Sequence, residues 1–118
     1  MAKTMERGMS LRCMLVGLGD AQAATCASAL MPIMMVRFAG ATEASASMST
    51  VLPLMVVAAR SLGDASLAEL ADIAETCAAE LFVLEDPSPP DVVQRLHDTL
   101  RRADNRRSGA SSRDDGFR

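Results

Sequence analysis

Aromatic residues are scarce in this chain. Its 118 residues include no tryptophan, no tyrosine and only three phenylalanines, and its formal net charge is −3. Proteins that hold single-stranded nucleic acid stack bases on aromatic side chains and neutralise phosphates with a basic surface. The composition therefore argues against nucleic acid as a partner of the folded part.

The side chains that usually carry catalysis are also few. There is one histidine, His97, one lysine, Lys3, and three cysteines at no metal-ligand spacing (Cys13, Cys26 and Cys77). Without a G-x-S-x-G motif or a second histidine, the sequence offers no nucleophile and base pair. We therefore expect no enzyme activity, no metal site and no cofactor.

Long hydrophobic runs are absent as well. The two uncharged stretches, Ala21–Val36 and Ala44–Ala59, are shorter than the roughly 20 residues that span a bilayer. An odd number of cysteines and the lack of a signal-peptide pattern are typical of the cytosol. The sequence thus predicts a cytoplasmic protein with no membrane contact.

What the chain does have is four apolar runs separated by stretches that can be helical. The runs are Cys13–Val16, Ile33–Val36, Leu52–Ala58 and Leu81–Leu84. Strands that alternate with helices predict βα units and a parallel sheet, because a parallel crossover needs a helix to cover the sheet. The predicted fold class is a small α/β domain of about four strands.

The ends of the chain differ from its middle. Residues 1–10 form a polar lead-in that we expect to be disordered, and residues 11–103 form the predicted domain. Asp104–Arg118 contains Phe117 as its only large apolar residue. Such a segment buries too little surface to offset the entropy of ordering. We therefore predict a disordered polar tail at 104–118.

Helix signals vary in strength along the domain. Ala21–Leu30 is rich in alanine, whereas the serine and threonine of Ala41–Thr50 predict a short, mobile helix. Asp64 or Ser66 can cap the next helix, and Ser66 with Glu69 matches a capping box. Ser88, followed by two prolines, predicts the N-cap of the last helix.

Charge is unevenly distributed. Between Arg60 and Arg95 there are eight acidic residues and no basic ones. This run is typical of a solvated helix face, but it also suits an acidic surface that docks a basic partner or the chain's own basic tail.

Two segments carry a family resemblance. Val36–Ala44 (VRFAGATEA) leads into Leu52–Arg60 (LPLMVVAAR), and together they resemble the receiver domain of bacterial response regulators, the signalling module of two-component systems. In that family a strand ending in a small residue and glycine precedes a Glu-Ala helix, and a P-D-L-V-L-L-D strand follows. The resemblance covers residues 11 to about 103. It implies a flavodoxin-like, doubly wound parallel sheet in the order 2-1-3-4.

The resemblance also implies a degenerate site. The phosphoacceptor position falls on Ala59, or on Ala58 if the register slips by one, and the acidic Mg²⁺ pair is reduced to Asp20. The family's Lys-Pro corresponds at best to Asp86-Pro87, with the charge reversed. We therefore expect a pseudo-receiver that acts by protein contact without phosphotransfer.

Receiver-like domains signal through the last elements of the sheet. We expect an interaction surface on the fourth strand, the loop after it and the final helix, and a homodimer or hetero-complex formed there because an exposed edge strand is a template for pairing. The residues of this predicted surface are Val83, Glu85, Asp86, Pro87, Arg95 and His97.

A second interpretation starts from the first strand. Gly17-Leu18-Gly19 follows it and resembles the dinucleotide-binding turn G-x-G-x-x-G, although Gln22 stands at the third glycine. Arg37, 20 residues after Gly17, is placed to meet an NADP 2′-phosphate. The alternative function is a minimal Rossmann-like nucleotide-binding half-domain that uses Gly17, Gly19 and Arg37.

Overall fold

The computed structural model describes residues 11–86 and 88–116, with side chains described as far as Arg106. The predicted lead-in at 1–10, Pro87 of the predicted interaction loop and residues 117–118 lie outside the described residues.

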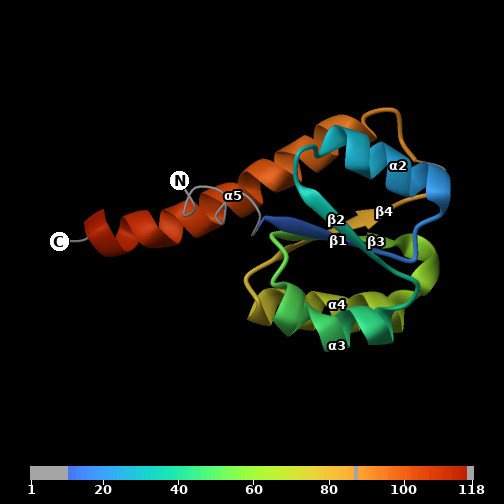
Figure 1. Ribbon diagram of the computed structural model, residues 1–118, viewed down its shortest axis with the longest axis horizontal. Coiled ribbons are helices and arrows are strands. Elements are labelled where there is room, and N and C mark those ends of the chain that lie inside the picture. Colours follow the sequence, from blue (N-terminus) through green and yellow to red (C-terminus); the bar gives the residue numbers. More distant parts are fainter. Residues whose placement is uncertain (1–10, 87, 117–118) are drawn as a thin grey trace.

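A parallel sheet occupies the centre of the described part of the chain (Figure 1). Its strands are β1 (Arg12–Val16), β2 (Met34–Phe38), β3 (Met55–Ala59) and β4 (Glu80–Leu84), in the order β2-β1-β3-β4. All three strand pairs are parallel. The predicted α/β class and the strand order 2-1-3-4 are confirmed, and the arrangement is compatible with a flavodoxin-like fold.

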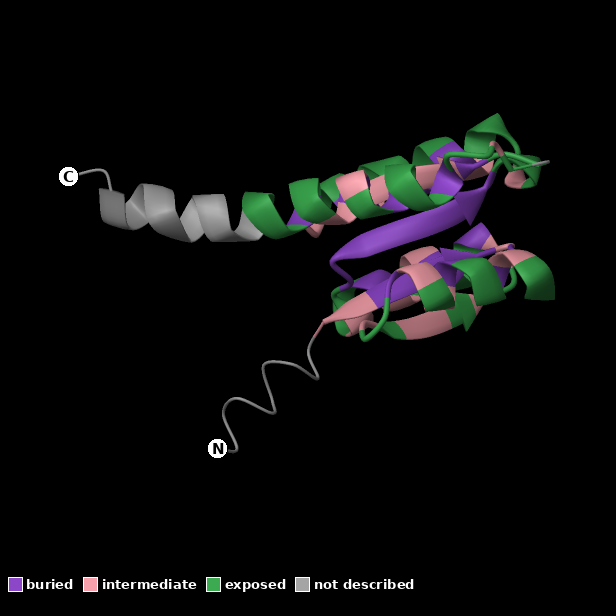
Figure 2. Ribbon diagram, turned by 90° about the horizontal axis from the view of Figure 1, so that it is seen from above, coloured by how far each residue is buried: buried purple, intermediate pink, exposed green. Residues whose placement is uncertain are grey.

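Helices cover both faces of this sheet. Helices α2 (Asp20–Ala29) and α5 (Val92–Gly116) lie together on one face, and α3 (Ala41–Val51) and α4 (Asp64–Thr76) lie together on the other (Figure 1). Figure 2 shows that buried positions gather where the helices meet the strands. The domain therefore has two hydrophobic layers, one on each side of the sheet.

Side chains of the central strands alternate between these layers. Cys13 and Leu15 of β1 join the cluster under α2 and α5, whereas Met14 and Val16 join the cluster under α3 and α4. Every residue of β3 is buried. Because both faces of the central strands are covered, these strands are apolar except for Arg12 at the start of β1, instead of alternating with polar residues.

Helix α3 is a complete helix of 11 residues, despite its serine and threonine content. Ala41, Ala44 and Met48 are buried against the sheet, and this packing offsets the weak helix propensity. Leu52 ends the helix with a φ of 51°, and its N–H donates to the Met48 carbonyl at 2.8 Å. The third strand consequently begins at Met55 and not at Leu52.

Helix α4 begins earlier than the sequence predicted. Gly63, with a φ of 96°, is the N-cap, and its carbonyl accepts the N–H of Leu67 at 3.0 Å. Glycine adopts this backbone conformation without steric cost. Ser66 lies inside the helix. The prediction that Ser66 and Glu69 form its capping box is therefore wrong.

Helix α5 starts later and ends later than predicted. It begins at Val92, and the Ser88 hydroxyl donates to the Glu85 carbonyl at 3.3 Å, so Ser88 is not its N-cap. Ala103 is the last buried residue among those whose side chains are described.

The helix nevertheless continues to Gly116 and projects past the sheet (Figure 1), where the sequence predicted a disordered tail. Once a helix has formed, each residue added to it gains an internal backbone hydrogen bond. Neither α5 nor any other helix in the described residues has both the length and the hydrophobicity needed to cross a bilayer.

Candidate functional site

The strand order reverses direction between β1 and β3, so the carboxyl edge of these two strands is the place where doubly wound domains hold ligands. Val16 at the end of β1 lies opposite Ala58 of β3. The loop Gly17–Gly19 and a 3-10 turn, η1 (Arg60–Leu62), extend from these ends. This edge is the site that both the receiver and the nucleotide interpretations require.

The predicted phosphoacceptor region does not form an acidic cluster. Ala58 and Ala59 are buried and contribute methyl groups. Asp20 lies in the first turn of α2 with its side chain 98% exposed, and it accepts a hydrogen bond from Arg37 Nη1 at 3.2 Å. Arg37 belongs to β2, on the opposite side of β1 from β3. The carboxylate is therefore held toward β2, away from Ala59.

Leu62 occupies the space above the strand ends. Gly17 has a φ of 73°, and a Cβ atom at this position would lie 2.8 Å from Leu62 Cδ2. Leu62 also packs against both hydrophobic clusters. An apolar side chain thus covers the point where the two layers meet. Leu62 was not predicted from the sequence to belong to this site. The sequence indicated only that an apolar residue lies between Ser61 and Gly63.

No group of three or more metal-ligating side chains occurs among the described residues. The buried thiols are equally unreactive, since burial raises the pKa of Cys13 to about 12 and that of Cys26 to about 11. A thiol that stays protonated is neither a nucleophile nor a metal ligand at neutral pH.

The three residues of the nucleotide interpretation do lie close together. Arg37 Nη2 donates to the Leu18 carbonyl at 3.1 Å, and Gly17 N–H donates to the Phe38 carbonyl at 2.9 Å. A hollow of about 330 Å³ opens beside them, lined by Gly17, Leu18, Arg37, Phe38 and Ala39.

The donors of the three predicted residues at this hollow already have partners. Gly19 N–H donates to Gln22 Oε1 at 3.3 Å, and the Arg37 guanidinium holds Asp20 and the Leu18 carbonyl. A phosphate would have to displace these contacts and approach the Asp20 carboxylate. These contacts therefore stabilise the turn and do not favour the binding of an anion.

The predicted interaction residues do not all share one surface. Val83 and Arg95 line a common hollow between β4 and α5. Glu85 accepts hydrogen bonds from Arg60 Nε and Nη2 at 3.2 and 3.0 Å, and this contact raises the pKa of Arg60. Asp86 is exposed.

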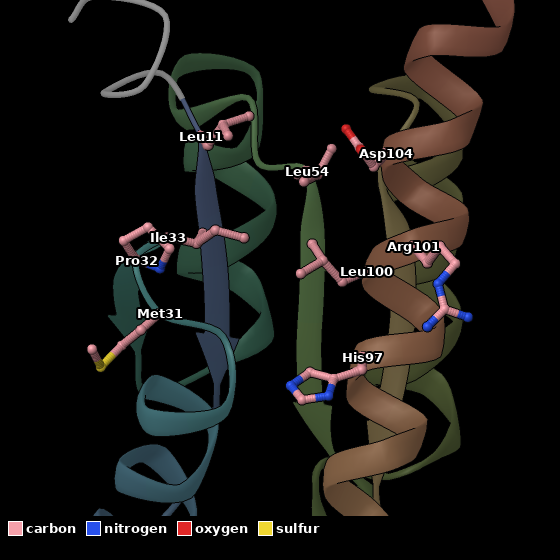
Figure 3. Close-up of a pocket in the computed structure, with 9 residues that line it drawn as sticks. All are labelled: Leu11, Met31, Pro32, Ile33, Leu54, His97, Leu100, Arg101 and Asp104. Carbon is pink, nitrogen blue, oxygen red and sulfur yellow. The ribbon is translucent and has the colours of Figure 1, made fainter.

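His97 faces a different way, toward α2, and its Nε2 lies 2.8 Å from the Ala29 carbonyl. It also lines an apolar hollow of about 400 Å³ at the start of the strands (Figure 3). The helix surface next to β4 therefore excludes His97. This helix surface includes Thr99 and Arg102 instead, and neither residue was predicted from the sequence.

Comparison with known proteins finds no relative: no protein-family model, no curated protein and no solved structure matches the chain significantly.

Proposed function

We propose that the chain is a non-catalytic, receiver-like signalling or scaffold module that acts by protein–protein contact without phosphotransfer. One observation carries this proposal. At the carboxyl edge of β1 and β3, where phosphotransfer needs carboxylates, there are the methyl groups of Ala58 and Ala59 and the side chain of Leu62.

The chemistry of phosphoryl transfer explains why this edge of the sheet cannot accept a phosphoryl group. A phosphoacceptor needs a carboxylate, and Mg²⁺ is held through one or two carboxylates together with water and phosphate oxygens. Asp20 is the one acidic residue of the predicted phosphoacceptor region, and its ion pair with Arg37 directs it away from β3. The domain keeps the doubly wound frame without the reactive groups.

We assign the contact surface to β4 and the adjoining side of α5. Leu81, Phe82 and Val83 are only partly buried there, and β4 lies at the edge of the sheet. An edge strand presents unpaired backbone groups to a partner. The partner is either a second copy of the chain or another protein.

Incubation with acetyl phosphate and Mg²⁺, followed by intact mass measurement, tests the absence of phosphotransfer. We expect no mass change, because Ala58 and Ala59 cannot be phosphorylated. A stoichiometric gain of one phosphoryl group that disappears in Asp20→Asn would contradict the proposal.

The nucleotide-binding half-domain remains the second candidate, favoured by the approach of Arg37 to the Gly17–Gly19 turn. A ligand that binds only the native state raises the thermal midpoint by mass action. We expect NADP(H), NAD(H) and ATP to leave the midpoint unchanged. A saturable increase that is lost in Arg37→Ala would favour this candidate instead.

A further inference from the structure

The outer edge of β4 has backbone groups that no described strand uses. Glu80 N–H donates to the Leu54 carbonyl at 3.2 Å, so the backbone of Glu80 points toward β3. Backbone direction alternates along a strand, so Phe82 and Leu84 also point toward β3, whereas Leu81 and Val83 point outward. Two N–H and two C=O groups therefore face the open edge.

Helix α5 forms a wall beside this edge. A hollow of about 280 Å³ lies between them, lined by Leu81, Phe82 and Val83 from β4 and by Arg95, Asp98, Thr99 and Arg102 from α5. Phe82 packs into the layer under α5, whereas Leu81 and Val83 pack into the layer under α4. A strand added here would meet α5 with one of its faces and the apolar α4 side with the other.

The α5 wall of the hollow is cationic. Arg95 is paired with Asp91 at 3.0 Å, and Asp98 already accepts from Gln94 at 3.0 Å and from Arg101 at 3.5 Å. Arg102 donates to the Thr99 hydroxyl at 3.1 Å and has no ion pair within the described residues. The edge therefore presents an uncompensated guanidinium to an incoming strand.

The same charges oppose a second copy of this chain. Arg106 pairs with Glu80 at 3.2 Å, whereas Val92 and Leu84 line one hollow at the other end, so α5 runs antiparallel to β4. A twofold axis perpendicular to the sheet, beside the middle of β4, would pair the two edges and place Arg95 of one copy near Arg102 of the other. Like charges in such a position select against self-pairing.

We propose that the open edge of β4 binds an extended segment of another protein as a fifth strand, with acidic side chains directed at Arg102 and Arg95. This inference rests on the proposed function and specifies the chemistry of the partner. The segment alternates acidic residues, which face α5, with apolar residues, which lie beside Leu81 and Val83. Main-chain hydrogen bonds supply affinity, and the alternate side chains supply specificity.

A displayed library of random short peptides tests this pattern. The library is first depleted on Val83→Pro, which lacks the outward N–H but keeps the bonds of β4 to β3, and is then selected on the wild-type chain. Proline is tolerated on an edge strand when its N–H side faces solvent. We expect the recovered peptides to alternate acidic and strand-forming apolar residues. Basic or helix-patterned sequences, or no enrichment over the depleted library, would overturn the proposal.

Amide exchange of the wild-type chain gives a measurement that needs no variant. With the most enriched acidic peptide, synthesised alone, we expect the amides of Leu81 and Val83 to become protected. Protection without peptide that grows with protein concentration would assign the edge to a second copy. Peptide binding that leaves both amides unprotected would exclude strand addition.

Two neighbouring arginines provide the matched charge test. We expect Arg102→Ala to weaken binding of the acidic peptide about fivefold, the size of one partly exposed ion pair. Arg101 lines the His97 hollow instead, so Arg101→Ala should weaken binding less, only through the loss of its 3.5 Å contact with Asp98. Equal effects of the two variants would contradict the assignment. A phosphoryl gain in the mass assay would refute the proposed function independently of any result with peptides.

Discussion

At the residue scale, Gly17 and Leu62 decide what the carboxyl edge of the sheet can hold. Gly17 adopts a φ of 73° so that the first strand can turn, and its missing side chain leaves room for Leu62. The contact joins the turn after β1 to the turn after β3. Doubly wound domains hold ligands at this edge of the sheet, and here the apolar side chain of Leu62 lies against Gly17.

We predict that Gly17→Ala lowers the free energy of unfolding by about 1–3 kcal/mol, because alanine is strained at positive φ and its Cβ displaces Leu62. Denaturant unfolding measures the change. Gly19→Ala is the control, since Gly19 has a φ of −74° and no atom within 4 Å of an added Cβ. Similar losses in both variants would mean that Leu62 does not press on Gly17.

At the element scale, α5 combines two different segments in one helix. Up to Ala103 it is held by burial, with Val92, Leu96, Thr99 and Ala103 against the sheet. Beyond that point, the one described contact with the sheet is the ion pair of Arg106 with Glu80. The first segment completes the hydrophobic layer that α2 begins, and the second extends the helix past the sheet.

We predict that truncation after Ala103 leaves the domain folded and lowers the free energy of unfolding by less than about 1 kcal/mol, the value of a partly exposed ion pair. Circular dichroism and the denaturant midpoint of both chains measure this. Arg106→Ala in the full chain should account for most of the loss. A much larger effect of truncation would show that the distal helix contributes to the core.

At the scale of the whole molecule, the described sheet has two open edges. β2 ends the sheet on one side and β4 on the other, and helices cover the faces but not the edges. Short edge strands reduce aggregation, and β4 has only five residues. The open edge of β4 supports the proposal that this strand binds a partner.

We predict that the chain alone is monomeric in light scattering at high micromolar concentration, because self-pairing through β4 would bring Arg95 and Arg102 of the two copies together. Val83→Lys, which adds a charge on this strand, serves as the comparison. A wild-type dimer that dissociates in Val83→Lys would show that a second copy occupies the edge.

The apolar runs and the alanine-rich intervals were sufficient to predict the α/β class. The resemblance supplied the strand order. Burial on both faces forces central strands to be apolar, so the signal is local and survives in the sequence. The lack of a carboxylate at Ala58 and Ala59 is likewise visible in the sequence, because the identity of a residue does not depend on packing.

Other features required the tertiary structure. Two contacts bring together residues that are distant in sequence, that of Leu62 with Gly17 and that of Asp20 with Arg37. The tertiary structure also places His97 on a different surface from Val83. Helix boundaries at Gly63 and Val92 follow from backbone angles and competing hydrogen bonds that no residue pattern fixes. The sequence determined by itself the α/β class and the apolar character of the central strands, but not which apolar residues are exposed, as Leu52 and Met34 are. Only the tertiary structure decided which side chains meet, because contacts between distant elements depend on how those elements pack.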